Sequence, residues 1–342
     1  MQTRDIQDLS FVELSGYFCS RCQESFRAKQ IFEWLYQKGA GTFADMTNLP
    51  QGLRDQLEKD FSFNAAKVIE ERLACDGTKK ILFSLTDKEK IETVLIPAAR
   101  RMTACLSTQV GCKFGCQFCA SGIGGFKRNL SCSEILSQVL YARQAALPVV
   151  LSHIVFMGIG EPLDNYDNVL KAIRIINSPE ALGIAARRIT ISTCGLVPEM
   201  KRLAQEGLQI ELSVSLHGYD QTSRDLLMPV SRKYPLADLM AACREHIKKT
   251  RRQITFEYIL LEGVTCHEKA AKALASLLKG MLCKVNLIAY NPVSEFARQC
   301  PSPADMMAFK NKLSRLGIHS TIRMPRGQDV SAACGQLRRS VK

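Results

Sequence analysis

The chain has 342 residues, which is long enough for a domain of about 200–250 residues with an appended unit. Hydrophobic residues make up 46% and charged residues 23% of the chain, as in globular proteins, so a disordered or collagen-like protein is excluded. The longest apolar run, residues 145–151, contains Pro148 and is far shorter than the ~20 residues that span a bilayer. The first residues are polar and charged, unlike a signal peptide. We therefore expect a cytoplasmic protein with no membrane contact.

Two features of the composition point toward function. Fourteen cysteines in a chain without a secretion signal are expected to be reduced, so metal binding or catalysis explains some of them better than a disulfide scaffold. The net charge of +13 is concentrated late in the chain: residues 1–100 carry 14 basic and 15 acidic side chains, whereas residues 241–342 carry 18 and 7. A basic C-terminal third favours a polyanion such as nucleic acid, although charge alone leaves a solvated basic face equally open.

Residues 1–100 are predicted to form a separate accessory domain, with residues 97–101 as the linker out of it. Apolar residues at 31, 32, 34 and 35 predict an amphipathic helix over residues 26–36 that ends near Gly39 and Gly41. A second helix is predicted from Pro50 to about residue 59. Three short apolar runs separated by turn residues then predict a β-meander over residues 67–73, 79–85 and 91–96.

Beyond residue 101, strands alternate with helices, a pattern typical of βα units and a parallel sheet. The predicted strands are residues 103–109, 153–157, 189–193, 210–216, 254–260, 285–289 and 318–322. The predicted helices are residues 133–146, 165–177, 197–205, 236–248, 267–278 and 303–316. About six units predict an α/β fold, a partial (β/α)6 barrel of the TIM type over residues 101–342, with the chemistry at the carboxyl ends of its strands.

Three cysteines follow the first predicted barrel strand. Cys112, Cys116 and Cys119 are spaced four and three residues apart on a loop that contains glycine. A [4Fe–4S] cluster normally takes four cysteine ligands, so three ligands would leave one iron open to an exogenous molecule, as an enzyme requires. The alternative is a zinc site completed by a distant cysteine or histidine. The position after strand one of a βα barrel favours the cluster.

Further polar and glycine residues stand at the predicted strand ends. They are Gly160, Glu161, Ser192, Ser215, Leu216, His217 and Asn291. Each of them has an ordinary structural explanation, such as a turn glycine or a strand-end histidine with a satisfied ring. Because these residues and the cysteine motif occur in register with five strand ends, we interpret them together as one cofactor-binding site.

The cysteine motif and the segments around it resemble the radical S-adenosylmethionine (SAM) superfamily and, within it, the RlmN/Cfr family of RNA adenosine methyltransferases. The segments that carry this resemblance are CLSTQVGC at 105–112, GFKRNL at 125–130, IGEP at 159–162, SLH at 215–217, NLIAYNP at 286–292 and AACGQL at 332–337. Matches at 26–36 and 91–97 extend it over nearly the whole chain. The resemblance implies a [4Fe–4S] cluster on Cys112, Cys116 and Cys119. It also implies two SAM molecules per turnover, bound by the strand-end residues.

The resemblance also implies a reaction. It is methylation of adenosine C2 in 23S rRNA, at the peptidyl transferase centre, and in tRNAs next to the anticodon. Cys334 would receive a methyl group as a thiolate, Cys105 would release the product and leave a transient disulfide, and Glu92 would accept the C2 proton. For Glu92 the alternative is an exposed strand glutamate. The position of Cys334 in a segment bracketed by glycines is typical of a mobile loop, which supports its role independently.

Partners follow from the same resemblance. We expect 23S rRNA and tRNA, an electron donor such as flavodoxin or ferredoxin, and a monomeric enzyme. Basic candidates for phosphate contacts are Lys127, Arg128, Arg187, Arg188, Lys248, Lys249, Arg251, Arg252, Arg323, Arg326, Arg338 and Arg339.

Three alternative functions stay open. They are C8 methylation of the Cfr type, a glycyl-radical activase and a non-catalytic metal-stabilised RNA-binding module. The remaining nine cysteines are interpreted as packing or surface thiols, since Cys19 and Cys22 form only a weak zinc motif.

Overall fold

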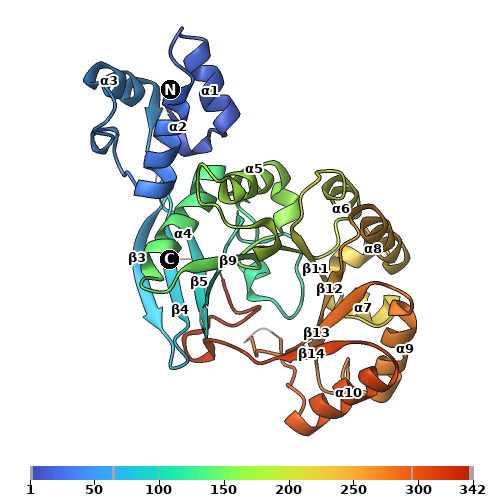
Figure 1. Cartoon of the computed structure of the whole chain (residues 1–342). Helices are drawn as coiled ribbons and strands as arrows, with labels where there is room; N and C mark the ends of the chain where they lie inside the picture. Colours follow the sequence, from blue (N-terminus) through green and yellow to red (C-terminus); the bar gives the residue numbers. More distant parts are fainter. Residues whose placement is uncertain (1–2, 64–65, 100, 294–295, 339–342) are drawn as a thin grey trace.

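The computed structural model describes residues 3–63, 66–99, 101–293 and 296–338. A small helical lobe stands beside a large α/β lobe that contains the predicted barrel (Figure 1). The small lobe contains β1 (Arg4–Asp5), α1 (Phe11–Cys19), α2 (Phe26–Phe32), α3 (Gln51–Asp60) and β2 (Phe61–Ser62). None of the described helices is both long and apolar enough to cross a membrane.

The predicted N-terminal helices are present, together with one that was not predicted. The helix expected over residues 26–36 is α2, which continues as a π-helical turn over Glu33–Lys38 and ends at Gly39 in the left-handed region, at φ 75°. The additional helix, α1, begins with a capping box in which Ser10 and Glu13 bond to each other's backbone N–H groups. This cap compensates for a short helix that contains Gly16 and has little intrinsic helical preference.

The predicted β-meander is present, and its sheet is continuous with the barrel sheet. Its strands β3 (Lys67–Leu73), β4 (Lys79–Ser84) and β5 (Lys90–Ala98) are antiparallel neighbours, and β5 pairs with the first barrel strand, β6 (Arg101–Cys105). The predicted linker is therefore a hairpin, with Ala98 opposite Arg101. The accessory strands extend the barrel sheet, and a domain boundary at residue 100 stays a prediction that would cut through one continuous sheet.

The parallel part of the sheet confirms the partial barrel. Strand β6 is followed in space by β9 (Leu151–Phe156), β10 (Ile189–Thr193), β11 (Glu211–Ser215), β12 (Ile254–Leu260), β13 (Cys283–Ala289) and β14 (Ser320–Arg323), all parallel. The helices between them are α4 (Cys132–Ala145), α5 (Tyr166–Asn177), α6 (Val197–Leu203), α7 (Gln221–Leu227), α8 (Leu236–Thr250), α9 (Glu268–Leu278) and α10 (Pro303–Arg315). Of these, α7 was not predicted. The first strand is shorter than predicted, because Gln109–Val110 (β7) pairs instead with Arg128–Asn129 (β8).

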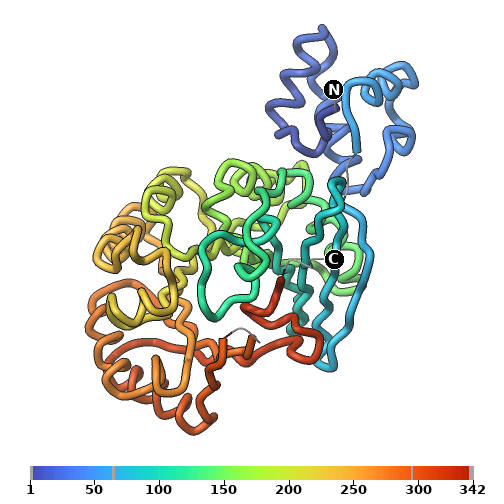
Figure 2. Tube along the Cα trace, turned by 180° about the vertical axis from the view of Figure 1, so that it is seen from behind, coloured from blue at the N-terminus to red at the C-terminus, as the bar shows by residue number. Residues whose placement is uncertain are grey.

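Residues 324–338 cross the side of the barrel that the sheet leaves open. After β14 the chain runs to the turn between β3 and β4, as the red segment in Figure 2 shows. The amide of Gly327 donates to Asp76 at 3.1 Å, and Asp329 accepts from the Cys75 amide at 2.9 Å. This C-terminal segment therefore connects the last barrel strand to the antiparallel extension.

Candidate active site

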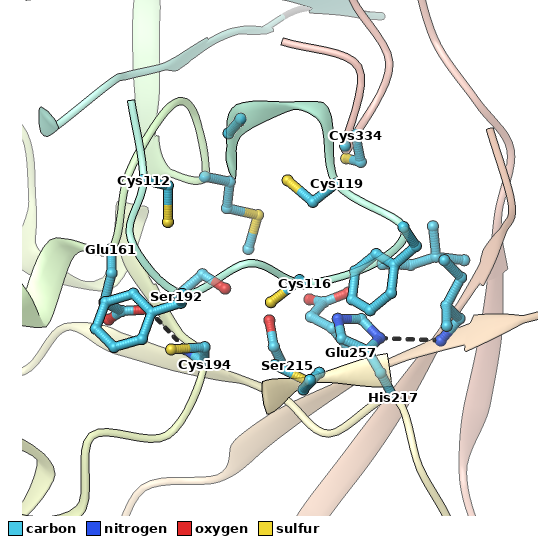
Figure 3. A pocket seen from close by; sticks show the side chains of 18 of the residues that line it. Cys112, Cys116, Cys119, Glu161, Ser192, Cys194, Ser215, His217, Glu257 and Cys334 are labelled. Carbon is cyan, nitrogen blue, oxygen red and sulfur yellow. Dashed lines mark hydrogen bonds between the residues drawn. The ribbon is translucent and has the colours of Figure 1, made fainter. Parts of the chain in front are cut away.

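A cavity lies at the carboxyl ends of the barrel strands, where the sequence predicts the chemistry. It encloses about 1000 Å³ of empty space, including its open mouth. Figure 3 shows the three motif cysteines on the loop that borders it, with strand-end side chains facing them. The predicted residues that line the cavity are Cys112, Cys116, Cys119, Gly160, Glu161, Ser192, Ser215, His217, Asn291 and Cys334.

The cysteine loop is folded tightly by glycines. Gly111 has φ +76°, and a Cβ placed on it would lie 1.7 Å from the carbonyl oxygen of Gly125, so the loop closes only with glycine at this position. Burial raises the pKa of the Cys112 thiol to about 12, and a thiol in this position becomes a thiolate through metal binding. The loop thus presents three thiols to one cavity.

The donor set consists of three cysteines that line one cavity. In a [4Fe–4S] cluster each cysteine binds a different iron, so its three thiolates stand further apart than the ligands of one zinc ion. The three cysteines are therefore suited to a cluster with one iron left open.

The segment after β9 brings a glycine backbone and a buried carboxylate to the cavity. A Cβ on Gly160 would lie 2.5 Å from Cβ of Gln109, and its φ of +100° also requires glycine. The carboxylate of Glu161 is buried and accepts hydrogen bonds from the amides of Cys194 at 2.7 Å and Leu163 at 3.1 Å. Burial raises the pKa of Glu161. Its side chain therefore fixes the loop against β10 and leaves the backbone of Gly160 at the cavity wall.

The ends of β10 and β11 supply hydroxyl groups and an imidazole. Ser192 and Ser215 line the cavity, and His217 has φ +52° with its Nδ1 accepting from the Ile259 amide at 3.1 Å. Burial lowers the pKa of His217 to about 3, so its ring is neutral. Leu216 differs from the other predicted cofactor-binding residues, because its side chain is in the core and only its backbone lies at the strand end.

A buried arginine that sequence reasoning missed holds these strand ends together. Arg224, on the unpredicted helix α7, is 1% exposed and donates to the carbonyl oxygens of Ser215 at 2.7 Å, Leu216 at 2.5 Å and Cys194 at 2.6 Å. Burial lowers its pKa. A charged side chain in a short polar helix looks solvent-exposed in the sequence, so nothing there indicates this role.

The C-terminal segment carries Cys334 onto the cysteine loop. Gly335 accepts from the Ala120 amide at 2.7 Å, and Asn291 Nδ2 donates to the carbonyl oxygen of Cys334 at 3.1 Å. Cys334 is exposed to the cavity, whose walls desolvate the thiol and raise its pKa, while Arg323 opposes the shift. The thiol therefore faces the three motif cysteines (Figure 3).

Cys105 lies behind this segment in a small apolar cluster. It packs with Val94, Ile159, Ala332 and Leu337 at the end of β6. Burial raises its pKa to about 12, and the nearby charge of Cys334 adds to the shift. The structure thus brings the two thiols that the resemblance pairs into electrostatic contact, one facing the cavity and one buried.

Glu92 is outside this cavity. Its carboxylate pairs with Lys80 at 3.1 Å and accepts from the Arg338 amide at 3.0 Å. It lines a separate polar pocket with Ser331 and Gln336, so residues 331–338 stand between Glu92 and the cysteines. The structure therefore does not bring Glu92 together with the other predicted site residues.

A second large hollow occupies the amino end of the barrel bore. Small polar residues line its wall, among them Thr103, Thr190, Ser213 and Thr255, where a closed barrel has bulky aliphatic side chains. Basic residues surround it: Arg101, Arg187, Arg188, Arg251, Arg252, Lys284 and Arg323. It shares Met157, Glu257 and Arg323 with the cysteine cavity.

The remaining basic candidates divide among other places. Arg128 is held by Glu134 and Asp87, and Arg326 lies 3.8 Å from Asp76. Lys248 and Lys249 are in the last turn of α8. Arg339 lies outside the described residues.

Comparison with known proteins identifies the family. Residues 4–62 match the N-terminal domain of ribosomal RNA large subunit methyltransferases, and residues 106–274 match the radical SAM superfamily. The probable dual-specificity RNA methyltransferase RlmN of Geobacillus kaustophilus is 46% identical over 335 residues, 97% of this chain and 92% of the relative. The chain belongs to the RlmN family.

Further comparisons agree. The RlmN of Clostridium perfringens (strain SM101 / Type A) is 43% identical over 98% of this chain and 97% of its own length. A crystal structure of a radical SAM methyltransferase from Sphaerobacter thermophilus superposes with a TM-score of 0.93 at 42% identity, over 98% of this chain and 99% of that one. The predicted family and fold are thereby confirmed. As a radical SAM methyltransferase of the RlmN family, the chain takes a [4Fe–4S] cluster and SAM as its cofactors.

Proposed function

We propose that this RlmN-family chain methylates C2 of adenosine in 23S rRNA, at the peptidyl transferase centre, and in tRNAs next to the anticodon. The observation that carries the proposal is the placement of Cys334. This thiol faces the three motif cysteines across the cavity, with Cys105 close behind it. The names of the curated relatives, dual-specificity RNA methyltransferases, support RNA as the substrate class.

The two thiols answer a chemical difficulty at C2. This carbon is electron-poor and cannot attack the methyl group of SAM, so an ordinary displacement fails. Cys112, Cys116, Cys119 and the strand-end residues would hold the cofactors, and two SAM molecules per turnover would supply a methyl group and a 5′-deoxyadenosyl radical. The Cys334 thiolate takes the methyl group, its S-methyl group gives a hydrogen atom to that radical, and the resulting carbon radical adds to C2.

Release of the product uses the remaining residues. The adduct radical passes one electron to an oxidised electron carrier, and Glu92 accepts the proton from C2. Cys105 then attacks the sulfur of Cys334, which breaks the sulfur–carbon bond and leaves a disulfide, and the released carbon takes up a proton to become the methyl group. A reductant such as flavodoxin or ferredoxin reopens the disulfide and supplies electrons. Because residues 331–338 separate Glu92 from the cavity, the proposal requires this segment to shift before Glu92 meets the base.

The basic hollow supports RNA binding by the barrel itself. Arg187, Arg188 and Arg251 stand at its mouth, where they can hold phosphates while an unstacked base enters the bore. The small lobe, matched to the RNA methyltransferase N-terminal domain, would orient the RNA. We further propose that the enzyme is monomeric and acts in the cytoplasm.

The test is mass spectrometry of digested 23S rRNA and tRNA from a strain that lacks the gene. We expect 2-methyladenosine to be lost in this strain and to be restored by the wild-type chain. The control variant Cys19→Ala, which removes an exposed thiol far in sequence from the residues of the cavity, should restore it as well. Cys334→Ala and Cys105→Ala should restore none. Loss of 8-methyladenosine with 2-methyladenosine intact would instead assign the Cfr-type reaction. Full activity of Cys334→Ala would favour a glycyl-radical activase.

A further inference from the structure

Glu257 is a buried acid that no part of the proposed reaction uses. It lies in the middle of β12, is 3% exposed, and its side chain lines both the cysteine cavity and the basic hollow. Met157 and Arg323 are the other residues shared by the two cavities. Glu257 therefore stands at the junction between the end of the bore that holds the thiols and the end that holds the arginines.

One oxygen of this carboxylate is satisfied and the other is not. Oε1 accepts from Asn286 Nδ2 at 3.0 Å and lies 4.0 Å from Arg323 Nη1. Within the described parts of the chain, Oε2 is buried without a hydrogen-bond partner. Burial raises the pKa of Glu257, and Arg323, Asn286, Ser213 and Lys284 oppose the shift. A buried acceptor without a donor is costly, so an unpaired oxygen on a side chain that lines two cavities indicates a ligand that donates to it.

The position in the bore limits what that donor can be. Glu257 is three residues from the start of β12, or about 10 Å along the strand, and the arginines of the hollow other than Arg323 lie at or before the strand starts. A nucleotide whose phosphate stays with the arginines reaches Glu257 with the edge of its base. The donor on the edge of an adenine base is its 6-amino group.

We propose that Glu257 is a specificity-determining residue that accepts a hydrogen bond from the 6-amino group of an adenine ring. The inference rests on the proposed function, since adenine enters as the RNA target. SAM carries the same ring, and Glu257 also lines the cysteine cavity in which SAM would bind. The shared chemistry is a 6-aminopurine, and the two sources are separated by experiment.

The RNA arm compares two anticodon-stem RNAs, one with adenosine and one with purine riboside, which lacks the 6-amino group, at the target position. With the cluster-loaded wild-type enzyme we expect methylation per RNA bound to fall about 10- to 100-fold for purine riboside, because a site built for a donor is left with an unpaired acceptor. In Glu257→Leu this discrimination should shrink to less than about 2-fold. Glu257→Gln keeps an acceptor oxygen and should retain most of it.

The SAM arm measures the dissociation constant of SAM, and of its purine analogue without the amino group, by equilibrium dialysis in the absence of RNA. If SAM is the source, the wild-type enzyme should prefer SAM about 10-fold or more, and Glu257→Leu should lose that preference. Glu262→Leu, which removes an exposed carboxylate from the loop after the same strand, is the matched control in both arms. Iron content and thermal midpoints establish that each variant is folded and loaded.

If Glu257→Leu loses the preference for the 6-amino group in either arm, the proposal is supported, and that arm identifies RNA or SAM as the source of the adenine ring. Wild-type discrimination below 2-fold in both arms overturns it without any variant, and unchanged discrimination in Glu257→Leu overturns it as well. A wild-type enzyme that does not methylate the adenosine RNA refutes the proposed function instead, and the SAM arm still tests Glu257.

Discussion

The two ends of the barrel bore are built from the same strands but carry opposite chemistry. At the carboxyl ends the inward positions hold thiols, glycines, Ser215 and a neutral histidine, all within a largely enclosed cavity. At the amino ends they hold small hydroxyl side chains with arginines around them. The difference teaches that the thiols and the arginines other than Arg323, which lines both cavities, are kept apart by the length of the strands, so a change at one end should leave the other intact.

The largest expected effect is at the carboxyl end. Cys116→Ala removes one of three cluster ligands, and we expect iron content after anaerobic purification to fall from about four to near zero per chain, with activity abolished. RNA affinity should be unchanged, since the arginines lie at the opposite end of the bore. Iron and sulfide analysis with fluorescence anisotropy measures both. A parallel loss of RNA affinity would show that the two ends are not independent.

The next largest effect concerns the strand ends themselves. Arg224→Met removes a donor from three buried carbonyl groups, of which that of Leu216 keeps the Gly218 amide at 2.7 Å. At about 1–3 kcal/mol for each group left unsatisfied, we expect at least about 2 kcal/mol lower stability. Urea denaturation measures this loss. Arg232→Met, an exposed neighbour, should change stability by less than about 0.5 kcal/mol. Equal midpoints for the two variants would contradict the role assigned to Arg224.

A smaller effect is expected at the amino end. Replacing both Arg187 and Arg188 with glutamine should weaken binding of the anticodon-stem RNA about 10-fold at low salt and lower the salt slope of log K by about 2. Cluster content should not change. The charge-matched control replaces Lys279 and Arg315, which are exposed beside the outer helices. If the control weakens binding equally, net charge and not the basic hollow holds the RNA.

The smallest effect is a shift in one titration. Burial lowers the pKa of His153 in the basic hollow, and Arg101 and Arg188 lower it further. Since the unfolded state binds the proton more readily, stability should fall as pH decreases below about 6.5, and His153→Gln should flatten this dependence. NMR titration of the His153 ring, assigned by its loss in His153→Gln, should show the pKa rising when RNA binds. An unchanged pKa would place the RNA elsewhere.

Much of the barrel could be predicted because hydrophobic residues recur with a clear period in its strands and helices. The predicted strands at 189–193 and 254–260 match β10 and β12 at both ends. Helices α1 and α7 were missed because they are short and begin with local caps, Ser10 and Asp220, rather than with a long amphipathic repeat. The cysteine motif could be found because its ligands are adjacent in sequence.

Relations between distant strands could not be predicted in the same way. Strand register decides which inward side chain of the segment ITFEYIL faces which cavity. The position of Glu257 therefore could not be predicted from the sequence. The separation of Glu92 from the cysteines depends on residues 331–338, which are almost 250 residues away from it in the chain. The grouping of arginines from different strand starts has the same origin.

The C-terminal segment also has a consequence for the order of folding. Its contacts with Asp76, Cys75 and Glu92 join residues separated by 251, 254 and 246 positions, and such distant contacts are slow to form because their loop-closure entropy is lost first. The cysteine loop, by contrast, is local. A chain that is still folding can therefore hold the ligands of the cluster in place before Cys334 arrives. The chemistry proposed for Cys334 would thus be reserved for the fully folded molecule.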